Sequence, residues 1–187
     1  MTRLLPEQTR AEPSPLERFN SIPAAEARRT LLMCLRSLRW ADRVTAHRPY
    51  PDLDSLLAAS DEAAYDLTPD DLAEALADET LPDLPEDMYE AAHMALSAAG
   101  TAYEARFGHA FVIYMGDTPP EETLDRFLEG IRSRLTNDPE DERVLAAEEL
   151  RRLARGRLIS ALRGAEPSPQ AAPPRAAAER ERSAPGK

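Results

Sequence analysis

Residues 138–163 read DPEDERVLAAEELRRLARGRLISALR, and this stretch predicts one long α-helix. Asp138 can accept a hydrogen bond from a backbone N–H of the first turn, and Pro139 suits the first helical position. Glu140 and Asp141 complement the positive end of the helix dipole. One face of the helix then carries Leu150, Leu153, Arg157, Leu158 and Leu162. The stretch therefore predicts a helix with an arginine on its apolar face.

The same start signal, a capping residue followed by proline and an early acid, occurs twice more. It reads Thr68-Pro69-Asp70-Asp71 and Thr118-Pro119-Pro120-Glu121. Apolar residues at helical spacing support further segments, among them Leu31, Leu32, Leu35 and Leu38. Together these signals predict helices over about 23–38, 40–47, 52–65, 69–79, 86–107, 119–135 and 139–163.

The choice of apolar residues favours helices over the whole chain. The 187 residues include 24 Leu and 32 Ala but only 3 Val and 4 Ile, so few natural strand formers are present. Only residues 110–115 read as extended, and this segment is too short and isolated to form a sheet. We therefore expect an all-α, single-domain bundle of about seven helices, in which residues 110–115 cross the core as irregular backbone.

The two ends of the chain differ in composition from the middle. Residues 165–187 hold five prolines and no apolar side chain larger than Ala, so they cannot bury enough surface to offset their conformational entropy. We predict a disordered tail there, a flexible N-terminus over residues 1–14, and a folded unit over 15–164.

The charge balance excludes several classes of partner. The formal net charge is -11, and before residue 164 the sequence has no Lys/Arg-rich run beyond Arg151-Arg152 with Arg155 and Arg157. We therefore expect neither nucleic acid nor an anionic membrane surface as a partner. A small anion remains open, since one buried arginine can bind it whatever the net charge. The first 20 residues lack an apolar run, so we expect a cytoplasmic protein.

Common catalytic and metal-binding motifs are missing from the sequence. Cys34 is the only cysteine, and His47, His93 and His109 have no partner at a metal-binding spacing, so we expect no metal site. The sequence also has no glycine-rich phosphate loop and no nucleophile elbow. We interpret Cys34 and Trp40 as core residues.

Six short phrases nevertheless occur in one order along the chain. They are Arg18-Phe19-Asn20-Ser21-Ile22-Pro23; Cys34 with Arg39-Trp40-Ala41; Arg48-Pro49-Tyr50; Tyr103-Glu104-Ala105-Arg106-Phe107-Gly108 with Phe111-Val112-Ile113; Arg134-Leu135-Thr136-Asn137-Asp138; and Arg157-Leu158. Over about residues 15–163 the series resembles the 2-oxo-4-hydroxy-4-carboxy-5-ureidoimidazoline (OHCU) decarboxylases. The resemblance implies an all-helical lyase without a cofactor, which forms (S)-allantoin during urate and purine degradation.

The sequence departs from this family at one informative place. The family carries a His-Pro-Arg-Ile-Gly motif after the helix that matches residues 69–77, and a Glu-Gln pair opens its next helix. Here residues 77–85 read ADETLPDLP, so neither motif is present and Glu79 falls at the position of the histidine. The family's proton-handling histidine is therefore missing, whereas its substrate-binding arginine has a counterpart at Arg157.

Arg157 and Glu79 are the first two candidate site residues. A guanidinium on an apolar helix face needs an anionic partner, so Arg157 predicts either a substrate anion or a structural ion pair. Glu79 could donate a proton if burial raised its pKa, or it could be a solvated acid at a helix end.

The other candidates lie between these two residues in sequence. His93 shares a helical face with Leu96 and Tyr103, so it could point inward, either as an acid–base group or as a buried neutral histidine. Glu90 could replace the family's helix-opening acid or be an ordinary exposed glutamate. The resemblance implies that Phe111 and Ile113 lie against the substrate ring; hydrophobic core is the alternative.

Two main functional hypotheses follow. The first is decarboxylation of OHCU to (S)-allantoin without a cofactor, with a small anionic purine-degradation intermediate as the ligand. The second is a catalytically inactive family member that binds small anions or serves as a helical interaction protein. A third, smaller alternative is an enzyme for another anionic substrate. The sequence leaves open whether the protein is a monomer or a homodimer.

Overall fold

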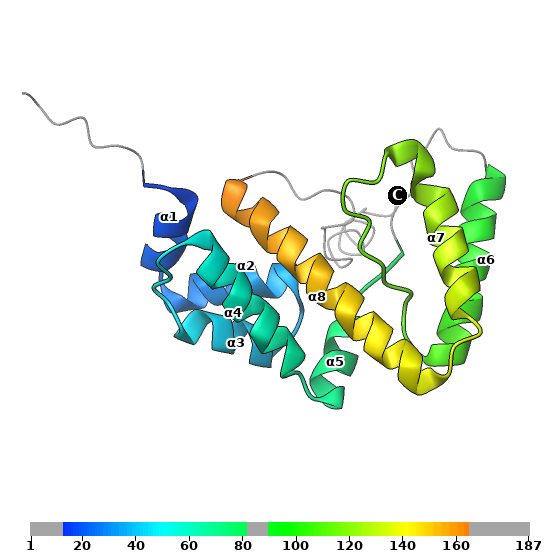
Figure 1. Ribbon diagram of the computed structural model, residues 1–187, viewed down its shortest axis with the longest axis horizontal. Helices are drawn as coiled ribbons and strands as arrows, with labels where there is room; N and C mark the ends of the chain where they lie inside the picture. The colour runs from blue at the N-terminus through cyan, green and yellow to red at the C-terminus, as the bar shows by residue number, and fades with distance from the viewer. Residues whose placement is uncertain (1–12, 82–89, 165–187) are drawn as a thin grey trace, which may run out of the picture.

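The computed structural model describes residues 13–81 and 90–164, and these residues form eight α-helices and no strand. The all-α prediction is confirmed (Figure 1). The helices are α1 (Pro15–Ser21), α2 (Ala24–Cys34), α3 (Leu38–Ala46), α4 (Leu53–Tyr65), α5 (Pro69–Leu76), α6 (Glu90–Phe107), α7 (Pro120–Arg134) and α8 (Pro139–Arg163). The predicted tail at 165–187, residues 1–12 and the start of the predicted helix 86–107 lie outside the described residues.

Local hydrogen bonds explain most of the helix starts. Thr68 accepts from the backbone N–H of Asp71 at the start of α5, and Asp138 accepts from that of Glu140 at the start of α8. The cap predicted at Thr118 is wrong. Its hydroxyl donates to the Met115 carbonyl, and Pro119 takes the cap position of α7.

Two further boundaries differ from the prediction. The helix expected over 23–38 ends at Cys34, because Leu35 and Ser37 adopt extended backbone and the Ser37 hydroxyl caps α3 at the Trp40 N–H. Helix α1 was not predicted, although Ser14 and Glu17 form a capping box around Pro15. This is the same start signal that predicted the later helices.

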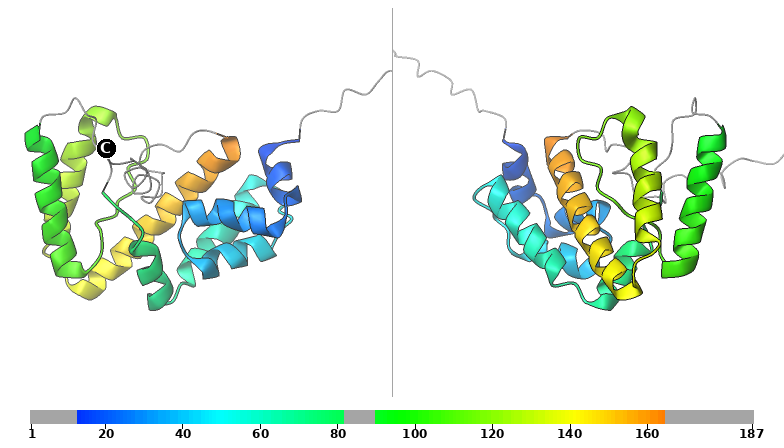
Figure 2. Two further views of the ribbon diagram at one scale, coloured as in Figure 1. Left: turned by 180° about the vertical axis from the view of Figure 1, so that it is seen from behind. Right: turned by 45° about the vertical axis from the view of Figure 1, so that its right-hand side comes forward.

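The buried apolar side chains form two clusters. The larger one joins α1–α5 with α8 around Trp40, whose side chain is fully buried and whose indole N–H donates to the Ser60 carbonyl at 3.0 Å. The smaller one joins α6 and α7 around Tyr103 and Phe127. Helix α8 runs diagonally past both groups of helices (Figures 1 and 2).

Residues 110–115 run as irregular backbone between the two clusters, as predicted. The side chain of Phe111 belongs to the smaller cluster, whereas that of the next residue, Val112, belongs to the larger one. A Cβ atom at Gly130 of α7 would lie 3.0 Å from the Phe111 ring, so the missing side chain allows α7 to approach this segment closely. The segment thus carries apolar side chains to both halves of the molecule.

No helix among the described residues is both long and apolar enough to span a membrane.

Candidate anion-binding site

Arg157, in the C-terminal half of α8, forms an ion pair with Glu79 just beyond the end of α5. Arg157 Nη1 lies 2.6 Å from Glu79 Oε1 and Arg157 Nη2 lies 2.8 Å from Glu79 Oε2. The guanidinium therefore donates a hydrogen bond to each of the two carboxylate oxygens. Each of the two side chains is only 10% exposed. Nη1 also donates to the Cys34 carbonyl at 3.2 Å. Glu79 is therefore not a solvated acid, and that alternative is wrong.

The short segment that carries Glu79 is anchored on both sides. On one side Asp78 pairs with Arg36 at 3.1 Å. On the other side Leu81 packs against α6 at Gly100, where a Cβ atom would overlap the leucine side chain. These two contacts, together with the hydrogen bond from the Glu79 N–H to the Leu76 carbonyl, direct the carboxylate toward α8.

A small cavity lies beside the Glu79–Arg157 pair. The described residues that line it are Glu79, Thr80, Phe111, Val112, Ile113, Phe127, Leu153 and Arg157. The predicted candidates Phe111 and Ile113 are thus beside the charged pair, and Phe111 is also a core residue with 1% exposure. The cavity volume of about 20 Å³ leaves room for about one water molecule.

A buried polar network supports the wall formed by residues 111–113. The fully buried Glu142 accepts from Arg134 Nε at 2.8 Å, from the Asn137 amide at 2.8 Å, and from the Tyr103 hydroxyl. Arg134 also donates to the Val112 carbonyl at 2.8 Å, and its guanidinium lies 4.6 Å from the centre of the Phe111 ring. The network therefore connects α6, α7 and α8 to the cavity wall.

The pKa values of Glu142 and Tyr103 in this network lie outside their ordinary ranges. Burial raises the pKa of Glu142, but hydrogen bonds from Arg134, Tyr103 and Asn137 outweigh burial and hold it below its usual value. Burial and the hydrogen bond to Glu142 both raise the pKa of the Tyr103 hydroxyl. Glu142 is therefore ionised and Tyr103 neutral at neutral pH.

Sequence reasoning missed Glu142, although a usable signal was present. Glu142 precedes Ala146, Leu150 and Leu153 at helical spacing, so an acid occupies the apolar face of α8. All four side chains are buried in the structure. The same reasoning that identified Arg157 would have identified Glu142.

Two predicted candidates lie away from the cavity. His93 and Glu90 are exposed on the first turn of α6, and neither side chain lines the cavity. The expectation that His93 points inward is wrong, because the buried face of α6 is limited to Leu96, Gly100 and Tyr103. Glu90 is an exposed helical glutamate.

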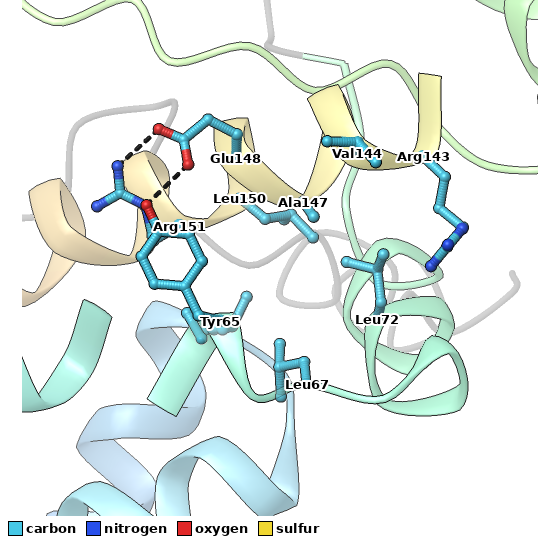
Figure 3. A pocket seen from close by; sticks show the side chains of 11 residues that line it. Tyr65, Leu67, Leu72, Arg143, Val144, Ala147, Glu148, Leu150 and Arg151 are labelled. Atoms are coloured by element: carbon cyan, nitrogen blue, oxygen red, sulfur yellow. Dashed lines mark hydrogen bonds and ion pairs between the residues drawn. The ribbon is translucent and has the colours of Figure 1, made fainter. Parts of the chain in front are cut away.

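A second cavity, of about 250 Å³, lies between α8 and the helices α4 and α5. Apolar side chains such as Leu67, Leu72 and Leu150 form most of its lining (Figure 3). Both cations that line it are already paired, Arg151 with Glu148 and Asp61, and Arg143 with Glu140. The larger cavity is thus separate from the Glu79–Arg157 pair, and no group of three metal-binding side chains occurs among the described residues.

The chain is similar in fold to two solved structures. One is described as the crystal structure of (S)-allantoin synthase, with a TM-score of 0.59 and 22% identity over 78% of this chain and 53% of that one. The other is described as the crystal structure of OHCU decarboxylase in the presence of (S)-allantoin, with a TM-score of 0.61 and 18% identity over 71% of this chain and 96% of that one. The chain thus spans about half the length of the first structure.

The family comparison agrees with the structural one. Curated protein sequences include no significant match to the chain. The sequence profile of the OHCU decarboxylases, however, matches residues 20–87 and 83–159, which together cover most of the chain and include both Glu79 and Arg157. The chain therefore belongs to the OHCU decarboxylase family.

Proposed function

We propose that the protein binds a small, planar, carboxylate-bearing ligand of the ureidoimidazoline class, with Arg157 as the anchor for the carboxylate. One observation carries the proposal: the Arg157 guanidinium already holds a carboxylate, that of Glu79, in a two-point geometry with little exposure to solvent. A site that orders one carboxylate in this way has the charge and the planar donor geometry to order another.

The cavity wall supports a flat ring as the rest of the ligand. Phe111, Ile113 and Phe127 present apolar surface next to the guanidinium. A planar heterocycle can pack against such a wall while its carboxylate contacts Arg157. The family to which the chain belongs is named for a substrate with this combination of ring and carboxylate.

Binding is better supported than proton transfer. The family's histidine position is occupied by Glu79, and a carboxylate engaged by a guanidinium is poorly suited to donate a proton. His93 and Glu90 are exposed and do not line the cavity. We therefore place the protein among the non-catalytic, anion-binding alternatives.

Decarboxylation of OHCU is the second candidate function, favoured by the position of Arg157 beside the apolar wall. Loss of CO₂ leaves electrons that the conjugated ring of the substrate can hold, so orientation and charge stabilisation supply much of the catalysis. In this alternative Arg157 binds the anion, and water supplies the proton to the ring carbon.

A coupled assay separates the two functions. OHCU is generated from urate with urate oxidase and hydroxyisourate hydrolase, and circular dichroism follows the formation of (S)-allantoin. We expect no acceleration above spontaneous decay. We also expect orotate, a stable planar ring carboxylate, to bind measurably in calorimetry. Acceleration that disappears in Arg157→Ala establishes the decarboxylase instead, and absence of both rate and binding refutes both functions.

The matched control is Arg155→Ala, on the same helix two residues earlier. Arg155 pairs with Asp61 at 2.9 Å and does not line the cavity. Arg157→Ala should weaken orotate binding by about 2–5 kcal/mol, because the carboxylate loses a charge-assisted partner. Arg157→Lys should restore only part of it, because an ammonium lacks the planar fork. Arg155→Ala should bind like the wild type.

A further inference from the structure

Glu79 takes the position on Arg157 that a ligand carboxylate needs. Both Nη atoms of the guanidinium are engaged by the two Glu79 oxygens. The space left beside the pair is about 20 Å³, which is too small for a carboxylate-bearing ring. Two carboxylates cannot share one fork without strong like-charge repulsion.

We infer that Glu79 is an internal competitor, a carboxylate built into the chain that must leave Arg157 before an external carboxylate binds. This inference rests on the proposed role of Arg157 as an anion anchor. The conformation in which Glu79 pairs with Arg157 is then the closed form of the site, and Glu79 regulates access to it.

The contacts around Glu79 favour this role over a simple structural pair. The residue lies on a short segment after α5, whereas Arg157 lies within the packed helix α8. The anchors of the segment, Asp78 with Arg36 and Leu81 against Gly100, lie on either side of Glu79 and do not involve its carboxylate. A rotation of the Glu79 side chain can therefore free the guanidinium without breaking either anchor.

The competition has a measurable consequence for affinity. When a binding-competent form is only a fraction of the population, the apparent affinity falls by that fraction. Removal of the Glu79 carboxylate should therefore strengthen binding of an external carboxylate, whereas a structural residue of the site would weaken binding when removed. The sign of the change distinguishes the two roles.

Acetate is the sharpest probe. Glu79→Ala removes the γ-methylene and the carboxylate, a fragment with the charge and nearly the size of acetate. We expect acetate to bind Glu79→Ala at least about tenfold more tightly than the wild type, measured by NMR titration of ¹³C-labelled acetate. The double variant Glu79→Ala/Arg157→Ala should lose this binding.

Two further variants complete the design. Glu140→Gln is the matched control, since it removes the same charge from an exposed acid of α8 that pairs with Arg143, and neither residue lines the cavity; it should bind acetate like the wild type. Glu79→Gln keeps the size of the side chain and should show an intermediate gain, which preserves the test if Glu79→Ala fails to fold.

The outcomes separate this inference from the proposed function. Equal acetate affinity in the wild type and both Glu79 variants, or binding that persists in the double variant, overturns the internal competitor. Acetate binding by Glu79→Ala without orotate binding by any form upholds the competitor and refutes the proposed ligand class. Orotate binding of equal strength in the wild type and Glu79→Ala upholds the proposed ligand class and refutes the internal competitor.

Discussion

Arg134 on α7 and Glu142 on α8 form a buried ion pair in which Arg134 Nε lies 2.8 Å from Glu142 Oε1. Neither side chain of this pair lines the cavity beside Arg157. Arg134 nevertheless donates a hydrogen bond to the Val112 carbonyl of the cavity wall. Tyr103 adds a contact from α6. Glu142 thus joins three helices, and its partner Arg134 contacts the wall beside Arg157.

Replacing Glu142 with Gln should destabilise the fold strongly. The variant leaves the Arg134 charge buried without its anion, and breaking a buried pair from one side typically costs about 3–5 kcal/mol. The measurement is urea unfolding followed by the fluorescence of the single tryptophan. Glu140→Gln is the control: Glu140 pairs with Arg143 on the exposed face of the same helix, and it should unfold like the wild type. A mild effect of Glu142→Gln contradicts the network.

The penalty of Glu142→Gln should shrink at low pH. The folded-state pKa of Glu142 lies below its usual value of about 4.5, so its stabilising effect is fully present above that pH. The effect is lost as the pH falls toward and through the lower, folded-state pKa, because in this range the unfolded state binds more protons than the folded state. Urea midpoints of both proteins at pH 7, 5, 4 and 3 should converge toward the acid end. A difference between the two urea midpoints that stays constant across this pH series contradicts the prediction.

The thiol of Cys34 should be unreactive in the folded protein. Burial raises its pKa to about 12, and the nearby Arg157 charge offsets this only in part. The reactive thiolate is therefore scarce at pH 8 and is also shielded from solvent. We expect almost no reaction with a disulfide reagent such as DTNB in native buffer and complete reaction in urea. Rapid modification under native conditions shows that the site next to Arg157 opens readily.

A double-mutant cycle should reveal strong coupling between Glu79 and Arg157. Arg157→Ala leaves the Glu79 charge mostly buried and should cost about 3–5 kcal/mol of stability. The double variant Glu79→Ala/Arg157→Ala should be less destabilised than the sum of the single changes, because each single change strands a charge. The more exposed pair Arg36–Asp78 is the control, with an expected coupling of about 1 kcal/mol or less. Additive effects at Glu79 and Arg157 contradict the ion pair.

The sequence by itself determined the helical class and most helix starts, because these depend on interactions within a few residues. Thr68 and Asp138 cap the helices that they were expected to cap, and the extended reading of residues 110–115 was correct. Ser14 shows that the same local signal also marked the helix that was overlooked. Backbone N–H groups at a helix start find their partners two or three residues away, so a short window of sequence contains the whole interaction.

Only the tertiary structure decided which groups meet. An arginine on an apolar helix face requires an anion, but the sequence does not indicate which of the 34 acidic residues lies next to it. Glu79 is 78 residues from Arg157, and Tyr103 is 39 residues from Glu142. The prediction that His93 points inward was wrong because helical periodicity indicates which residues share a face. It does not indicate how much of that face the neighbouring helices cover. Electrostatic attraction depends on distance in space, and that distance is set by the packing of α8 against both clusters.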